Sequence, residues 1–205
     1  MLSEWSAECG PDDPVLVVPW SDPAHPEIHF IDLRENPYDL DHLPEAEQHP
    51  TLLQVLRALN APRSPVFTAK CDAWTVAATN ADDTYAQSEL AYLHLHLQQG
   101  AEETPVAFAS YIDLLWRDRT VFASLHRHEQ LLDRLTRRAV PLDHPYAMLE
   151  LVLRPALVDL AGAQEGFAVS LYIKALGYGP ESANQNWSRA FNDVVALLRN
   201  KAFAS

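Results

Sequence analysis

The sequence predicts an α+β protein with a mainly antiparallel sheet, built from hairpins, and with helices packed on one face. Residues 148–153 and 167–176 alternate apolar with polar side chains, as two strands buried on one side do. Residues 181–201 carry an apolar stripe at helical spacing, so this helix can cover the apolar face of the hairpin. Consecutive strands recur as pairs, giving the order ββ-α-ββ-αα-ββ-α, which favours antiparallel pairing over parallel crossovers.

The length and composition of the chain predict one domain over residues 1–205. The 205 residues are 48% hydrophobic, enough to fill a core, and no polar linker divides them. Many of the 15 prolines lie in the first 65 residues, so we expect a loop-rich segment over residues 1–48. Within it, residues 15–18 and 28–33 are the candidate strands.

The middle of the chain contains one clear helix and one ambiguous segment. Leucines at helical spacing predict a helix over residues 50–59, and residues 66–77 are rich in β-branched and aromatic side chains, as strands are. Residues 89–98 fit both a strand and a helix. Their strict alternation at the end favours a strand that pairs with residues 66–77 as a second hairpin.

Two further helices are predicted before the C-terminal hairpin. Thr104 and Pro105 form a typical helix start, and Phe108, Tyr111, Ile112 and Leu115 follow at helical spacing. A second helix is expected to begin at Thr120 and to end near residue 138.

The charge of the chain excludes some classes of partner. The formal net charge is −13, whereas proteins that bind DNA or RNA need cations that neutralise phosphates. No apolar run is long enough to span a membrane, and the N-terminus lacks an apolar signal segment. Cys9 and Cys71 are far apart in sequence and are expected to stay reduced. We therefore expect a cytoplasmic protein with no nucleic-acid or membrane partner.

The histidine pair His94 and His96 is the candidate metal site. On a strand both imidazoles project from one face, and Glu89, Asp72 or Cys71 would supply a third ligand. The alternative is a solvated polar row on a half-exposed sheet, so no cofactor is assigned.

No catalytic residue is assigned either. Cys71 next to Asp72 permits a nucleophile, but a cysteine within a strand is more often a small core residue. The chain lacks the glycine-rich and HExxH motifs of common enzyme classes. Whether the protein is an enzyme stays open.

The second face of the C-terminal hairpin is the candidate partner or ligand surface. It carries Glu150, Arg154, Tyr172 and Lys174, which meet there if the two strands pair in register. The alternative is a salt-bridged outer face without a binding role.

Three functions are consistent with these patterns. The first is a non-catalytic module that binds a protein partner or a second copy of itself. The second is a small-molecule enzyme with a metal bound by His94 and His96. The third is a regulatory domain that binds a small ligand between its sheet and helices.

Overall fold

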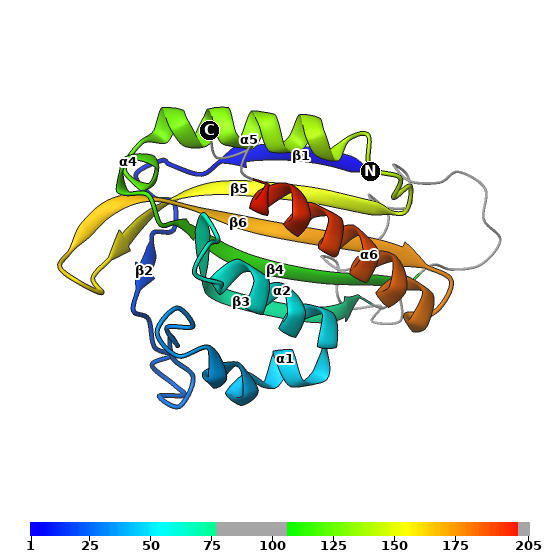
Figure 1. Ribbon diagram of the computed structural model, residues 1–205, viewed down its shortest axis with the longest axis horizontal. Coiled ribbons are helices and arrows are strands. Elements are labelled where there is room, and N and C mark those ends of the chain that lie inside the picture. Colours follow the sequence, from blue (N-terminus) through cyan, green and yellow to red (C-terminus); the bar gives the residue numbers. More distant parts are fainter. Residues whose placement is uncertain (77–105, 201–205) are drawn as a thin grey trace.

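The computed structural model describes residues 1–76 and 106–200, and six strands of this part form one sheet. The strand order is β1-β5-β6-β4-β3, and β2 also pairs with β5 (Figure 1). The strands are β1 (Leu2–Ala7), β2 (Leu16–Val18), β3 (Val66–Val76), β4 (Val106–Trp116), β5 (Ala147–Val158) and β6 (Gln164–Gly177). The helices are η1 (Pro37–His42), α1 (Pro44–Gln48), α2 (Pro50–Asn60), α4 (Arg119–Phe122), α5 (Leu125–Ala139) and α6 (Pro180–Arg199).

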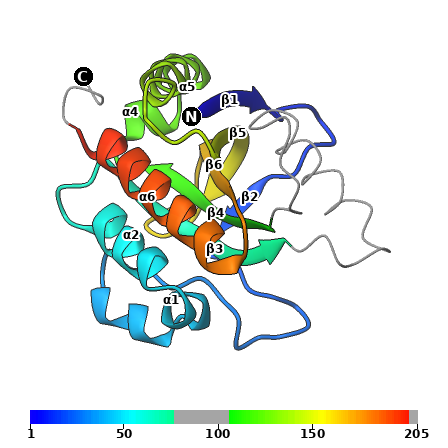
Figure 2. The same ribbon diagram turned by 90° about the vertical axis from the view of Figure 1, so that its right-hand side faces the viewer.

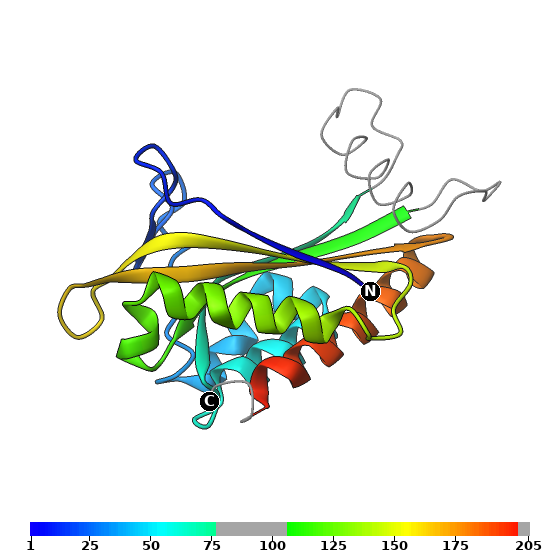
Figure 3. The same cartoon turned by 90° about the horizontal axis from the view of Figure 1, so that it is seen from above.

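The sheet is mostly antiparallel, which confirms the predicted fold class. Strand β3 pairs antiparallel with β4, β4 with β6, and β6 with β5, while β1 and β2 run parallel to β5. Helices α2, α5 and α6 all lie on one face of the sheet (Figures 2 and 3). The face turned away from these three helices is called the outer face below.

The core lies between the sheet and the three long helices. Leu171 and Ile173 of β6 are 1% and 0% exposed, and they point toward α6 as the alternation predicts. Trp187 of α6 packs its ring 4.6 Å from that of Phe108, and its Nε1 donates a hydrogen bond to Ser110 Oγ at 2.8 Å. The predicted C-terminal hairpin and its covering helix are therefore confirmed, with both strands longer than expected.

Strand β4 overturns the prediction of a helix beginning at Thr104 and Pro105. The residues at helical spacing in this segment belong to a nearly continuous apolar run, VAFASYIDLLW, and such runs fit a buried strand as well as a buried helix. Pairing decides between them: β4 lies between β3 and β6, so its backbone is hydrogen-bonded on both edges. The partner of β3 among the described residues is thus β4. The predicted pairing with residues 89–98 lies outside the described residues.

Residues 28–33 are not a strand, contrary to the prediction. Only an isolated bridge joins Ser21 to His29, and Asp32 then turns the chain by accepting hydrogen bonds from the backbone N–H and the side chain of Arg34. Phe30 and Leu33 are buried all the same, because this loop packs its apolar side chains against the sheet and helices. The apolar residues of this segment therefore indicate that it is buried, although it does not pair as a strand.

The other elements agree with the sequence, with three differences. Helix α2, strand β3 and strand β2 lie where they were predicted. Strand β1 was not predicted, and the short helices η1 and α1 lie within the segment predicted to be loop-rich. The single helix predicted from Thr120 to about residue 138 is divided into α4 and α5, each with its own capping side chain, Asp118 and Ser124. Among the described residues, no helix is long and apolar enough to cross a membrane.

Candidate interaction surface on the outer face of the sheet

The outer face brings together the four residues predicted to form a partner or ligand surface. The register sets Tyr172 of β6 opposite Glu150 of β5. On the same face, Lys174 lies two residues beyond Tyr172 and Arg154 lies four residues beyond Glu150. On its other side Tyr172 faces Tyr111 of β4. The two predicted strands therefore pair as expected, and the surface extends beyond them across β4 to β3. The binding role of the surface remains a prediction.

An aromatic row crosses this face over three strands. It consists of Trp74 on β3, Tyr111 on β4 and Tyr172 on β6. The ring centres of Trp74 and Tyr111 are 6.3 Å apart, and those of Tyr111 and Tyr172 are 5.8 Å apart. Trp74 is 36% exposed, and both tyrosines are partly buried. These spacings fall in the range of favourable aromatic contacts, so the row is a fixed platform.

Two ion pairs lie beside the aromatic row, and each includes one residue of β5. Lys174 Nζ lies 3.0 Å from Glu150 Oε2, and also 5.8 Å from the centre of the Tyr172 ring. Arg154 Nε donates to Glu8 Oε2 at 2.8 Å. Burial alone would lower the pKa of Arg154, but its bond to Glu8 and the neighbouring Tyr172 raise that pKa. Both cations are therefore held in place by carboxylates from the same face.

A chain of buried polar side chains runs beside the row on the same face. Arg154 Nη1 donates to Ser170 Oγ at 3.2 Å, and that hydroxyl donates to Asp113 Oδ1 at 2.5 Å. Burial raises the pKa of Asp113, while the hydrogen bond from Ser170 and the charge of Arg154 oppose this shift. Burial, with the charges of Asp113 and Asp72, also raises the pKa of Tyr111. The phenol of Tyr111 thus stays neutral at physiological pH.

Two carboxylates at the margins of the face have no cationic partner among the described residues. Glu4 of β1 lies opposite Glu150, but Lys174 pairs with Glu150. Asp72 of β3 lies opposite Tyr111, and among the described groups its carboxylate accepts a hydrogen bond only from the neighbouring backbone N–H of Ala73. Both side chains are exposed. The aromatic row therefore lies between two carboxylates that no cation in residues 1–76 or 106–200 neutralises.

The predicted metal site is only partly described. His94, His96 and Glu89 lie outside the described residues. Cys71 and Asp72 are successive residues of β3, opposite Ile112 and Tyr111, so they point to opposite faces of the sheet. In residues 1–76 and 106–200, no group of three His, Cys, Asp or Glu side chains is arranged to hold a metal ion.

Sequence reasoning missed three members of this surface: Trp74, Tyr111 and Asp113. The helix predicted over β4 placed Tyr111 on its apolar stripe and left Asp113 without a role. Once β4 is known to be a strand, period-two alternation places Tyr111 and Asp113 on one face, and on β3 it places Trp74 on the same face as Asp72.

Comparisons with known proteins leave the chain without an assigned family. No family model matches it, and searches of curated proteins and of solved structures found no match either. Its function must therefore be argued from the geometry of its own residues.

Proposed function

We propose that this protein is a non-catalytic interaction module whose outer face binds a basic segment of a partner protein. The observation that carries this proposal is the aromatic row of Trp74, Tyr111 and Tyr172. It lies between the carboxylates of Glu4 and Asp72, which have no cationic partner in the described part of the chain. Aromatic faces attract Lys and Arg side chains, and nearby carboxylates strengthen that attraction.

The composition of the face suits an interface more than an active site. Trp, Tyr and Arg are the residue types that contribute most to binding energy at protein interfaces. Here they are held by hydrogen bonds and ring contacts, so little side-chain freedom is lost on binding. Lys174 already lies by the Tyr172 ring, which is the contact that a partner cation would make with Tyr111 or Trp74.

The overall charge favours a basic partner over a second copy. Each copy carries a formal net charge of −13, so two copies repel one another at low salt. A basic segment is instead attracted to the protein before contact, which raises its association rate. An interaction module could also bind a second copy of itself through this face, and sedimentation equilibrium distinguishes that case.

A pair of synthetic peptides tests the proposal. One alternates arginine with leucine, and the other has glutamate at each arginine position. Titrated into the isotope-labelled protein, the basic peptide is expected to shift amide resonances of β3, β4 and β6 around the aromatic row. Its binding should weaken as salt rises, because exposed charges are screened. The acidic peptide should shift none of them.

Two substitutions make the test specific to the outer face. Trp74→Ala should weaken binding of the basic peptide by about tenfold, since it removes a cation–π partner and contact area. Tyr38→Ala is the control, because Tyr38 is 82% exposed and lies on η1, away from the row. Equal binding of both peptides, or equal losses in the two variants, would contradict the proposal. A dimer in sedimentation equilibrium that Trp74→Ala dissociates would assign the face to self-association instead.

A further inference from the structure

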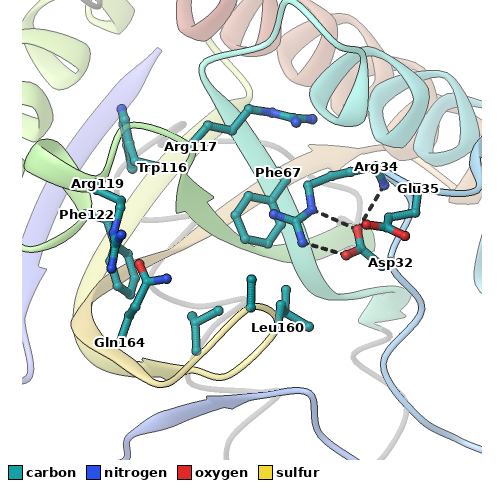
Figure 4. A pocket seen from close by; sticks show the side chains of 12 residues that line it. Asp32, Arg34, Glu35, Phe67, Trp116, Arg117, Arg119, Phe122, Leu160 and Gln164 are labelled. Carbon is teal, nitrogen blue, oxygen red and sulfur yellow. Dashed lines mark hydrogen bonds and ion pairs between the residues drawn. The ribbon is translucent and has the colours of Figure 1, made fainter.

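A second site lies at the end of the sheet, away from the aromatic row. Strand β6 begins at Gln164 but pairs with β4 only from Ala168 onward, so the β5–β6 hairpin projects past the end of β4. Beside this projection is a cavity of about 690 Å³. It lies between the hairpin, α4, the start of β3 and the loop that follows Asp32 (Figure 4). We call it the arginine pocket, because Arg34, Arg117 and Arg119 all line it.

One wall of the arginine pocket is fixed by close packing. Phe122 of α4 lies so near to Gly166 of β6 that a Cβ added at Gly166 would fall 2.5 Å from the carbonyl oxygen of Phe122 and 2.6 Å from its ring. Only glycine permits this approach. The ring of Phe122 is 5% exposed and lines the pocket together with Val158 and Leu160 of the hairpin. This part of the cavity is therefore a preformed apolar surface.

Two of the three arginines are already held by the protein. Arg34 pairs with Asp32 through two nitrogen–oxygen contacts, and its guanidinium lies 4.0 Å from the centre of the Phe67 ring. Arg117 donates from Nε to the Val66 carbonyl and from Nη2 to the Asn60 carbonyl. These contacts hold both guanidinium groups in place, that of Arg34 on the Asp32 carboxylate and that of Arg117 on backbone carbonyls.

Arg119 differs from both. It is the first residue of α4, it is exposed, and among the described residues it has no hydrogen-bond or ion-pair partner. Figure 4 shows it at one end of the pocket beside Phe122 and Gln164, while the Arg34–Asp32 pair and Glu35 lie at the opposite end. The Arg119 cation therefore lies next to the apolar wall, at the end of the pocket opposite Asp32 and Glu35.

We infer that the arginine pocket binds a small organic carboxylate with an apolar body. The carboxylate is bound by Arg119, with the Gln164 amide within the same end of the cavity, and the body lies along Phe122, Val158 and Leu160. Glu35 sets the orientation, because it repels a carboxylate from the opposite end. The volume lies within the range of about 300–1,000 Å³ that is typical of small-molecule sites. The lining carries three arginines and two carboxylates, a formal charge of +1 in a chain of net charge −13, so an anion is repelled less here than at most of the surface.

Binding of 3-phenylpropionate, compared with its neutral amide, tests the inference. Both molecules have the same shape, and only the first carries a carboxylate. Nuclear magnetic resonance titration of the labelled protein should show saturable shifts at Phe122, Leu160 and Gln164 with the acid. The amide should bind at least about tenfold more weakly, because it loses a charge-assisted hydrogen bond to arginine. Inorganic phosphate, which has the charge but no apolar body, should also bind more weakly than the acid.

Arg119→Gln and Arg138→Gln form a matched pair of variants. Both arginines are exposed, so neither change should alter the melting temperature, and Arg138 lies near the far end of α5 from the pocket. Arg119→Gln should weaken binding of the acid by about tenfold, and Arg138→Gln should leave it unchanged. Equal affinity for acid and amide, equal effects of the two variants, or shifts outside the pocket would overturn the inference. None of these outcomes depends on peptide binding to the aromatic row, so the two proposals fail separately.

Discussion

The two faces of the sheet bury side chains by different physical means. On the face toward the helices, Leu171 and Ile173 are buried against Trp187 and other apolar groups, and burial is favourable in itself. On the outer face, Asp113, Ser170 and Lys174 are also less than 9% exposed, and each is hydrogen-bonded or ion-paired. Burial of these polar groups is tolerated only because their partners are present. One face therefore provides stability, and the other holds polar groups in a defined geometry.

The largest expected difference between the faces concerns two successive residues of β6. Leu171→Asp places a carboxylate in the apolar core and should cost at least about 4 kcal/mol of unfolding free energy, enough to unfold a protein of ordinary stability. Tyr172→Ala, on the outer face, should cost about 1–2 kcal/mol and leave a folded protein, because Tyr172 is only partly buried.

Denaturant unfolding followed by circular dichroism measures both variants. Leu171→Ala should remain folded with a loss of about 3 kcal/mol, which keeps the comparison measurable if Leu171→Asp does not express. A cooperative transition of Leu171→Asp close to that of the wild type would show that the register of β6 is wrong.

A smaller effect is expected at a buried polar contact within the apolar face. Ser110 accepts the indole hydrogen bond of Trp187 in a fully buried position. Ser110→Ala leaves that N–H without an acceptor and should cost about 1–3 kcal/mol. Trp187→Phe removes the donor but also leaves a cavity.

A double-mutant cycle separates these contributions. If the hydrogen bond couples the two residues, the double variant should cost less than the sum of the two single changes, by about 1 kcal/mol or more. Strict additivity would show that the contact contributes nothing. Ser6→Ala, on the exposed side of β1, is the control for the loss of a hydroxyl.

The difference between one-sided and two-sided burial also explains which elements the sequence could predict. The alternation in β6 and the stripe on α6 were readable because each has one apolar and one polar side. Strand β4 was misread because it is buried on both faces and paired on both edges, so no polar side marks its period. Strand β1 was missed because its pairing depends on the free edge of β5, which local sequence does not encode.

The candidate surface was predicted only as far as local pairing reaches. Glu150, Arg154, Tyr172 and Lys174 lie on strands joined by one turn, so their register follows from the hairpin. Trp74 and Tyr111 join them through pairing between distant segments, which no local pattern specifies. The arginine pocket is harder still, since Arg34, Arg119 and Gln164 come from three segments that meet only in the folded chain.

Helix α5 contains a buried histidine that should make the stability of the protein depend on pH. His128 is fully buried, its Nδ1 donates to the Ser124 carbonyl at 3.0 Å, and burial lowers its pKa below the ordinary value of 6.5. The unfolded chain therefore takes up a proton near pH 6.5, and the folded protein does so only at lower pH. Stability should be fully present above pH 6.5 and decrease as the pH falls below that value.

His128→Phe tests this directly, because it removes the titrating group from the same position. The wild type should lose more unfolding free energy than the variant between about pH 7.5 and about pH 5, measured by denaturant titration. His126→Gln, on the exposed side of the same helix, is the control. Parallel pH profiles of the wild type and His128→Phe would contradict the assignment.

The smallest expected effect lies in the Glu150–Lys174 pair of the outer face, and it should be asymmetric. The lysine side chain is 10% exposed and the glutamate side chain 30% exposed. Glu150→Gln leaves an ammonium group with little access to water and a weaker acceptor, so it should cost about 1–2 kcal/mol. Lys174→Met leaves a carboxylate that water still reaches, and its apolar side chain fills the same space, so it should cost less than about 1 kcal/mol.

The order of these two losses, measured by denaturant unfolding, tests whether polar burial on the outer face depends on its partners. If Lys174→Met were the more damaging change, the ammonium itself would be stabilising. Equal small losses in the two variants would instead make the pair an ordinary surface salt bridge, in which either partner can be removed at little cost. The expected order instead follows from the burial of Lys174, which requires a carboxylate beside it for the same reason that Asp113 requires Ser170.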